Sequence, residues 1–278
     1  MISLRRYPTP RSVATFALAL LASSVVACAS GESADDDAGG APAAEQATAG
    51  ESLGYAAAIL DVAGRSEDDH FRDGGMKPLE VYAFFGVEPG MTIGDLSTSG
   101  MYNAHILSQI AGPDGKVYAV VGLGDTLREG QLERVQGTLD NRNVDGVLSN
   151  VEVIGILEDL PDNSIDMLIT VRNYHDFGER ADRIANVLRM LRVLKPGGIL
   201  GAIDAHTDKT DERDESVHRL NEALARDEIV EGGFEFVGAS ELLYNPDDTL
   251  DFDGRRPDDP IHRYYIQRWV LKFRKPLS

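Results

Sequence analysis

Short β-branched runs alternate with longer segments of helical spacing along most of this chain, and this alternation restricts the fold more than any other feature. Such a pattern is typical of parallel βαβ units, in which each strand is followed by a crossover helix. Helical spacing is clearest where Ala181, Ile184, Val187, Leu188 and Leu191 recur on one face before a Lys-Pro-Gly-Gly stop. The predicted strands are 91–96, 117–121, 151–156, 165–171, 199–204, 234–237 and 264–273.

The connections between these strands predict how the sheet is ordered. Predicted helices cover 53–62, 78–85, 102–111, 126–139, 181–194 and 211–230. A polar excursion over 245–260, rich in Asp, Pro and Gly, precedes the last strand and reads as a solvated loop. A long connection before the final strand favours its insertion as a hairpin. We therefore expect an α/β fold with a doubly wound, mostly parallel, seven-stranded sheet and an antiparallel last strand.

The N-terminal residues have the pattern of an export signal rather than of a folded element. Arg5, Arg6 and Arg11 accompany an apolar run over 13–26, which is shorter than the ~18 to 20 residues that span a bilayer. Val25-Val26-Ala27-Cys28 resembles the bacterial lipobox, and Cys28 is the single cysteine of the chain. The alternatives are a membrane-spanning helix and an ordinary free thiol.

These features divide the chain into three parts. Residues 1–28 are predicted to be a lipoprotein signal peptide, 29–50 a disordered acidic linker and 51–278 the folded domain. The expected location is the periplasmic side of a membrane, with the lipid on Cys28 as the only membrane contact. Ala29 favours the outer membrane over the inner one, by similarity to lipoprotein sorting signals.

The charge of the chain limits its partners. Its formal net charge is −19, from 27 Lys and Arg against 46 Asp and Glu. Nucleic-acid binding depends largely on the neutralisation of phosphates by basic residues. We therefore expect a small-molecule substrate and no nucleic-acid partner.

Polar residues at the ends of predicted strands are the candidates for chemistry, because open α/β sheets bind ligands outside the carboxyl ends of their strands. The first strand ends in Asp95, and a turn of small residues with Ser97, Ser99 and Gly100 leads to a helix at Tyr102. Backbone amides at such a helix start can face a ligand. Asp95 is as well suited to capping its own turn, and Tyr102 to packing under the helix.

This turn resembles the first motif of class I S-adenosylmethionine-dependent methyltransferases, and the similarity extends over nearly all of 53–278 to a group of exported bacterial predicted methyltransferases. The resemblance implies S-adenosylmethionine as cofactor and methyl transfer to a small molecule as activity. It implies cofactor contacts for Asp95, Ser97, Ser99, Gly100, Tyr102, Asp159 and Asn173. The matching stretches are Arg65-Ser66, Arg72-Asp73, Lys77-Pro78, 84–91, 172–176, 195–198, 232–234, 242–247 and 270–275.

Several positions depart from the family pattern. Ser97, Ser99 and Met101 stand where the family has glycines. Val121 replaces the acid that would hold the ribose, and the acid expected near Ile156 is absent, although Asp159 follows closely. The alternative function is therefore a ligand-binding lipoprotein that kept the fold and lost catalysis.

A histidine follows the fourth predicted strand. His175 is placed to accept a proton from a substrate, with Asp176 beside it, so this pair is the predicted catalytic site. Capping of the following helix is the competing role for His175. A metal site of His175, Asp176, Asp204 and His206 is a third possibility, but their spacing does not support it, and no metal is expected.

Overall fold

The computed structural model describes residues 57–123, 127–210, 213–253 and 264–278. The predicted signal peptide, the linker and Cys28 lie outside the described residues. Among those that are described, no helix has the length and apolar character needed to cross a membrane.

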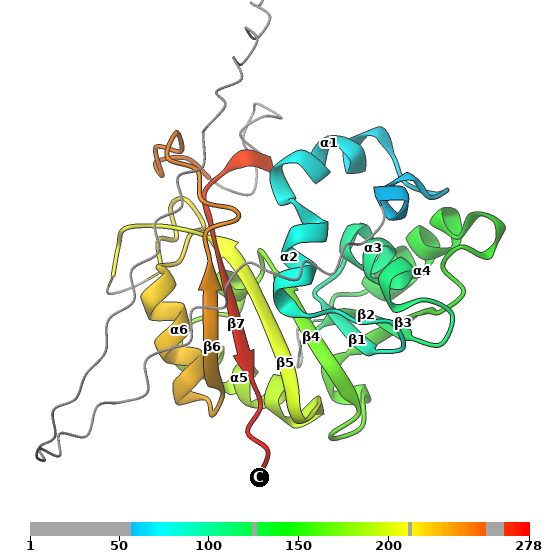
Figure 1. Ribbon diagram of the computed structural model, residues 1–278. Coiled ribbons are helices and arrows are strands. Elements are labelled where there is room, and N and C mark those ends of the chain that lie inside the picture. The colour runs from blue at the N-terminus through cyan, green and yellow to red at the C-terminus, as the bar shows by residue number, and fades with distance from the viewer. Residues whose placement is uncertain (1–56, 124–126, 211–212, 254–263) are drawn as a thin grey trace, which may run out of the picture. The chain divides into compact units, whose positions relative to one another are not determined.

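The folded unit is built on a seven-stranded sheet with the order β3-β2-β1-β4-β5-β7-β6. β1 to β5 are mutually parallel, whereas β7 runs antiparallel to both of its neighbours, β5 and β6 (Figure 1). The predicted hairpin insertion of the last strand is thus confirmed. The strands are β1 Thr92–Leu96, β2 Lys116–Gly122, β3 Val151–Ile156, β4 Ile165–Val171, β5 Leu194–Ala205, β6 Glu235–Ser240 and β7 Arg268–Arg274.

Helices cover both faces of this sheet. One core joins α1 to α4 to the sheet through buried side chains such as Phe85, Ile106 and Met167, and a second core joins α5 and α6 through Val187 and Ile229. Burial on both faces explains why the central strands are almost continuously apolar. The helices are α1 Glu67–Met76, α2 Pro78–Phe85, α3 Tyr102–Ala111, α4 Gln131–Arg142, α5 Arg180–Val193 and α6 Glu222–Glu231.

The first helix, α1, was not predicted from the sequence. Its two glycines and low apolar content hide it, but it begins at a capping box in which the Ser66 hydroxyl accepts from the Asp69 amide and the Asp69 carboxylate accepts from the Ser66 amide. A serine followed three residues later by an acid is the sequence signal that would have found it.

The helix predicted over 211–230 is shorter in the structure. α6 begins only after Asn221, whose side chain accepts from the amides of Ala223 and Leu224. Before it, Asp214 and Arg219 pair their backbones in a tight turn. An Asn side chain competes for backbone amides and so favours a helix start over a helix interior. β7 likewise begins at Arg268 rather than at 264.

Candidate active site

The turn after β1 keeps the backbone of a glycine-rich loop although serine and methionine occupy it. Ser97 and Met101 have φ values of 56° and 62°, the left-handed region that glycine adopts most easily. The Met101 side chain is fully buried in the core under α3. Gly100 has an ordinary φ, and a Cβ there would meet open space. Ser99 is exposed.

Asp95, at the end of β1, is a buried carboxylate with one oxygen in use. Its Oδ1 accepts from Asn103 Nδ2 at 3.3 Å, and Asn103 Oδ1 accepts from the Tyr82 hydroxyl at 3.0 Å. Oδ2 makes no hydrogen bond within the described part of the chain. Burial raises the pKa of Asp95 to about 6, against the opposing effects of the Thr98 and Asn103 side chains. An unsatisfied buried oxygen is costly unless a partner completes it.

Tyr102, the first residue of α3, is held by side chains from α1 and the segment before it. Its hydroxyl donates to Asp73 Oδ1 at 2.7 Å, and the same oxygen accepts from Arg65 at 2.6 Å. The Arg72 guanidinium lies 4.0 Å from the ring centroid. Arg72 therefore occupies one face of this ring, which was predicted to contact the cofactor.

The guanidinium of Arg72 places a positive charge near Asp95. Its Nε is buried and makes no hydrogen bond in the described structure, and its charge acts on the Asp95 carboxylate. Arg72 and Asp73 are not paired with each other, since Asp73 binds Arg65 and Tyr102. The two α1 residues are thus part of a network around Tyr102.

Two further predicted contacts, Asn173 and Asp159, and the departure at Val121 lie near the ends of strands. Asn173 donates from Nδ2 to the carbonyl oxygens of Leu96 and Val171, at 3.3 and 2.8 Å, so it ties the end of β1 to that of β4. Asp159 accepts from the Ile156 amide at 3.2 Å and caps the turn after β3. Val121, near the end of β2, is buried and apolar.

His175 lies between two carboxylates after β4. Its Nδ1 is 2.7 Å from Asp204 Oδ1, and its backbone amide donates to Asp204 Oδ2 at 2.9 Å. Nε2 lies 3.3 Å from Asp176 Oδ2. Although burial alone would lower the pKa of His175, these carboxylates raise it to about 9. A histidine charged at neutral pH and almost fully buried is poorly suited to accept a substrate proton, so its surroundings weigh against the predicted role as a base.

A second histidine that was not singled out from the sequence joins this group. His218 Nδ1 lies 3.6 Å from Asp176 Oδ1, and its ring centroid lies 5.9 Å from that of His175. It comes from the turn before α6, where no local pattern marks it. The structure differs from the alternative metal site of His175, Asp176, Asp204 and His206. His206 pairs with Asp208 at 3.3 Å, and the carboxylate of Asp204 binds Nδ1 of His175.

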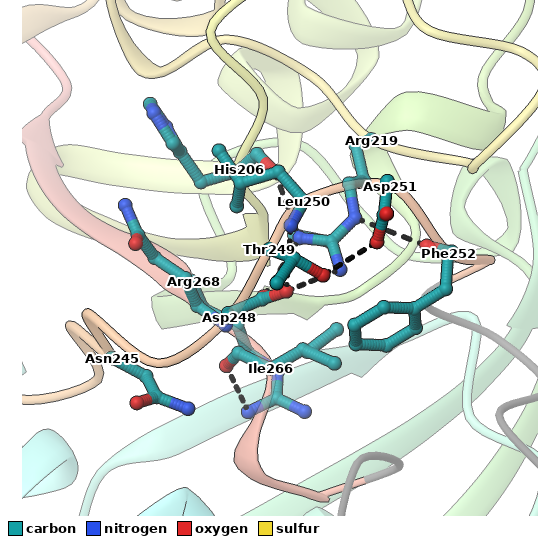
Figure 2. Close-up of polar contacts among 12 residues, drawn as sticks. His206, Arg219, Asn245, Asp248, Thr249, Leu250, Asp251, Phe252, Ile266 and Arg268 are labelled. Atoms are coloured by element: carbon teal, nitrogen blue, oxygen red, sulfur yellow. Dashed lines mark hydrogen bonds and ion pairs between the residues drawn. The ribbon is translucent and has the colours of Figure 1, made fainter.

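Two connections beyond the sheet are joined by Arg219 and Asp248, as Figure 2 shows. Arg219 also donates to the carbonyl oxygens of His206 and Phe252. The segment around Asp248 was expected to be a solvated loop, but this aspartate has a buried side chain. A cavity of about 430 Å³ lies beside it, lined in part by Leu242 and Asp248.

Comparison with known proteins identifies the fold. No protein-family model and no curated protein matches the chain. An S-adenosylmethionine-dependent methyltransferase from Aquifex aeolicus is similar over 76% of this chain and 99% of its own, with TM-score 0.54 and 19% identity. The chain has the class I methyltransferase fold. A proposed methyltransferase of Bacillus halodurans aligns with 73% of this chain and 100% of its own, with TM-score 0.50 and 18% identity.

The same fold serves other chemistry as well. The [4+2]-cyclase SpnF aligns with 76% of this chain and 81% of its own, with TM-score 0.50 and 14% identity. Because function belongs to sites rather than to folds, the activity of this class I fold has to be argued from its own residues.

Proposed function

We propose that this protein is an S-adenosylmethionine-dependent methyltransferase acting on a small molecule. The observation that carries the proposal is a pair of buried atoms without a hydrogen bond in the described residues, Asp95 Oδ2 at the end of β1 and Nε of Arg72 in α1, whose charge acts on the Asp95 carboxylate. A carboxylate and a guanidinium facing one turn match the ammonium and carboxylate of an amino acid, which is the tail of this cofactor.

The polar groups around the turn after β1 fit the amino-acid end of the cofactor better than its ribose. Ser97 and Met101 keep the left-handed backbone that a close ligand requires, and the buried Met101 side chain points into the core. Near the end of β2, Val121 offers no hydrogen-bonding side chain for the ribose. We therefore expect the amino-acid end to contribute most of the polar recognition, and the overall affinity to be modest.

The cofactor would supply an electrophilic methyl group on a sulfonium. Within this proposal Asp95 and Arg72 bind and orient its amino-acid end, and Asn173 fixes the strand ends that border the cleft. Correct placement of reacting atoms can provide much of the acceleration of such a displacement. Because His175 is held as a cation, positioning rather than proton removal carries the proposed mechanism.

Calorimetric titration of S-adenosylmethionine, and separately of S-adenosylhomocysteine, into the full-length protein tests the proposal. We expect saturable binding of both. Asp95→Ala should weaken binding at least tenfold, because it removes the partner of the cofactor ammonium. Asp114→Ala, which changes an exposed acid in the turn before β2, serves as the matched control and should bind like the unaltered protein.

Absence of saturable binding at millimolar concentrations of either ligand would overturn the proposal. Equal weakening by Asp95→Ala and Asp114→Ala would show that the recognition assigned to the β1 turn is wrong. If S-adenosylmethionine binds as expected, screening of small hydroxyl and amine compounds with methyl-labelled cofactor would identify the acceptor.

The location of the protein is a separate part of the proposal. The lipobox-like stretch 25–28 supports export and attachment through a lipid on Cys28, with the domain on the periplasmic side. Fractionation of cells that express the full-length chain tests it. The unaltered protein should stay with the membrane fraction and carry a lipid label, whereas Cys28→Ser should not carry the label. Equal lipid labelling of both proteins would contradict the anchor.

A further inference from the structure

Three side chains that converge beside β4 and β5 have the chemistry of a metal site. His175 and Asp176 belong to the 3-10 turn Tyr174–Asp176, and His218 comes from the turn before α6. One nitrogen or oxygen atom from each residue lies within 4.8 Å of the others. Segments separated by some 40 residues in sequence thus present two imidazoles and a carboxylate at one point.

The His175 ring is oriented as a metal-binding imidazole usually is. Its Nδ1 is fixed by Asp204 Oδ1 at 2.7 Å, and the same carboxylate accepts from the His175 amide through Oδ2. Nε2 is buried, makes no hydrogen bond within the described structure and is directed toward Asp176. A carboxylate behind a histidine fixes the ring and increases its basicity as a ligand.

Charge and access also favour a cation here. Asp204 and Asp176 contribute two carboxylates, and the guanidinium of Arg213 lies 3.6 Å from Asp176 Oδ1. The Asp176 side chain is 41% exposed, so an ion can reach the cluster from solvent. Mixed imidazole and carboxylate donors suit divalent transition metals such as Zn²⁺ better than Mg²⁺ or Ca²⁺, which prefer oxygen ligands.

We propose that His175 Nε2, Asp176 and His218 bind a divalent transition-metal ion that takes the place of the proton on Nε2, with Asp204 as the outer partner of His175. Three protein ligands leave at least one coordination position open to water or to a bound molecule. No ligand of this site belongs to the Asp95 turn, so metal binding stands independently of the proposed cofactor site.

Titration of Zn²⁺ into the chelator-treated full-length protein tests the site. A Cys28→Ser background removes the single thiol of the chain as a competing ligand. We expect one tight equivalent of Zn²⁺. His218→Ala and Asp176→Asn should each weaken it more than about 100-fold, because even the loss of an outer partner costs about 10–100-fold in affinity.

His206→Ala is the matched control, since His206 lies outside the cluster and should leave Zn²⁺ affinity unchanged. Co²⁺ provides a second readout, because visible d–d absorption reports nitrogen and oxygen coordination and should disappear in His218→Ala. Circular dichroism of each variant establishes that it is folded. Absence of a tight equivalent, or equal loss in His206→Ala and His218→Ala, would overturn the proposal.

Discussion

Arg219 and Asp248 form a bidentate ion pair that joins the segment after β5 to the connection before β7. Two guanidinium nitrogens lie 2.9 and 3.1 Å from the two carboxylate oxygens, and both side chains are almost fully buried. A bidentate pair fixes relative orientation as well as distance. These two segments lie at the carboxyl end of β5 and the start of β7, so the pair fixes how they meet at that edge of the sheet (Figure 2).

Removal of the carboxylate from this pair should be strongly destabilising. Asp248→Ala leaves the Arg219 charge buried without its partner, and breaking such a pair typically costs about 3–5 kcal/mol. Denaturant unfolding of the full-length protein measures the loss. Asp247→Ala, at an exposed neighbour, should change the free energy of unfolding by less than about 0.5 kcal/mol. Similar losses for both variants would contradict the importance of the pair.

Cofactor binding should depend on the protonation of Asp95. With its pKa raised to about 6, the carboxylate is charged at pH 7.5 and mostly protonated at pH 5. We expect the affinity for S-adenosylmethionine to be about tenfold lower at pH 5, because a neutral acid attracts the ammonium poorly. Calorimetry at the two pH values measures this change. Asp95→Asn should bind weakly at both, and a wild-type pH dependence in that variant would exclude Asp95 as its source.

The same carboxylate should limit stability at neutral pH. A raised folded-state pKa means that the folded protein holds a proton that the unfolded chain releases between about pH 4 and pH 6. The stabilisation from this protonated group is present below about pH 4 and is lost as the pH rises through 6. Asp95→Asn, which imitates the protonated acid, should therefore be more stable than the unaltered protein at pH 7.5 in denaturant unfolding, and lower stability would contradict this expectation.

His105, buried in α3, should contribute the opposite dependence. Burial lowers the pKa of its imidazole to about 4, so the folded protein keeps the ring neutral while the unfolded chain takes up a proton below about pH 6.5. Stability from this group is present above pH 6.5 and is lost as the pH falls toward 4, by at most about 1.4 kcal/mol per pH unit. His105→Leu should reduce that slope.

The effect of His105 is best measured where Asp95 does not oppose it. In an Asp95→Asn background, unfolding at pH 5 and pH 7.5 should show a clear loss of stability toward acid, which His105→Leu should diminish. His70→Gln, at an exposed position in α1, should leave the slope unchanged. An identical slope with and without His105 would place the acid sensitivity elsewhere.

Most of the sheet could be predicted from apolar runs, capping residues and turn residues, because each of these features determines a single strand or helix. The bounds of α2, α3, β3 and β4 agree with those expected from apolar runs, capping residues and turns. The antiparallel direction of β7 was expected from the long connection before it. Failures arose where side-chain hydrogen bonds overrule periodicity, as at the Ser66 capping box and at the Asn221 helix start.

The candidate site was less accessible to such reasoning. Strand-end placement predicted a site around Asp95 and another around His175, since parallel strands bring their carboxyl ends to one edge. It could not reveal that Arg72 covers Tyr102, or that His218 approaches His175, because these contacts join segments of unrelated local pattern. The charge of His175 likewise depends on Asp204, which only the fold brings beside it from the end of β5.

The two left-handed positions of the β1 turn should respond differently to glycine. A non-glycine residue in this conformation costs about 1–2 kcal/mol. Glycine avoids this cost, but part of the gain is lost because glycine has greater conformational freedom in the unfolded chain. Ser97→Gly should therefore raise the free energy of unfolding by up to about 1 kcal/mol. Met101→Gly relieves the same strain but empties a fully buried site, and loss of a core side chain of this size costs about 2–5 kcal/mol, so that variant should be destabilised.

Gly100→Ala completes the comparison within the same turn. Gly100 has an ordinary φ and open space around it, so alanine should be tolerated with little change. Denaturant unfolding of the three variants should thus give a gain, a loss and no effect at positions 97, 101 and 100. A gain in Met101→Gly would mean that backbone strain outweighs core packing in this turn, and a loss in Ser97→Gly would mean that the serine side chain stabilises the loop it occupies.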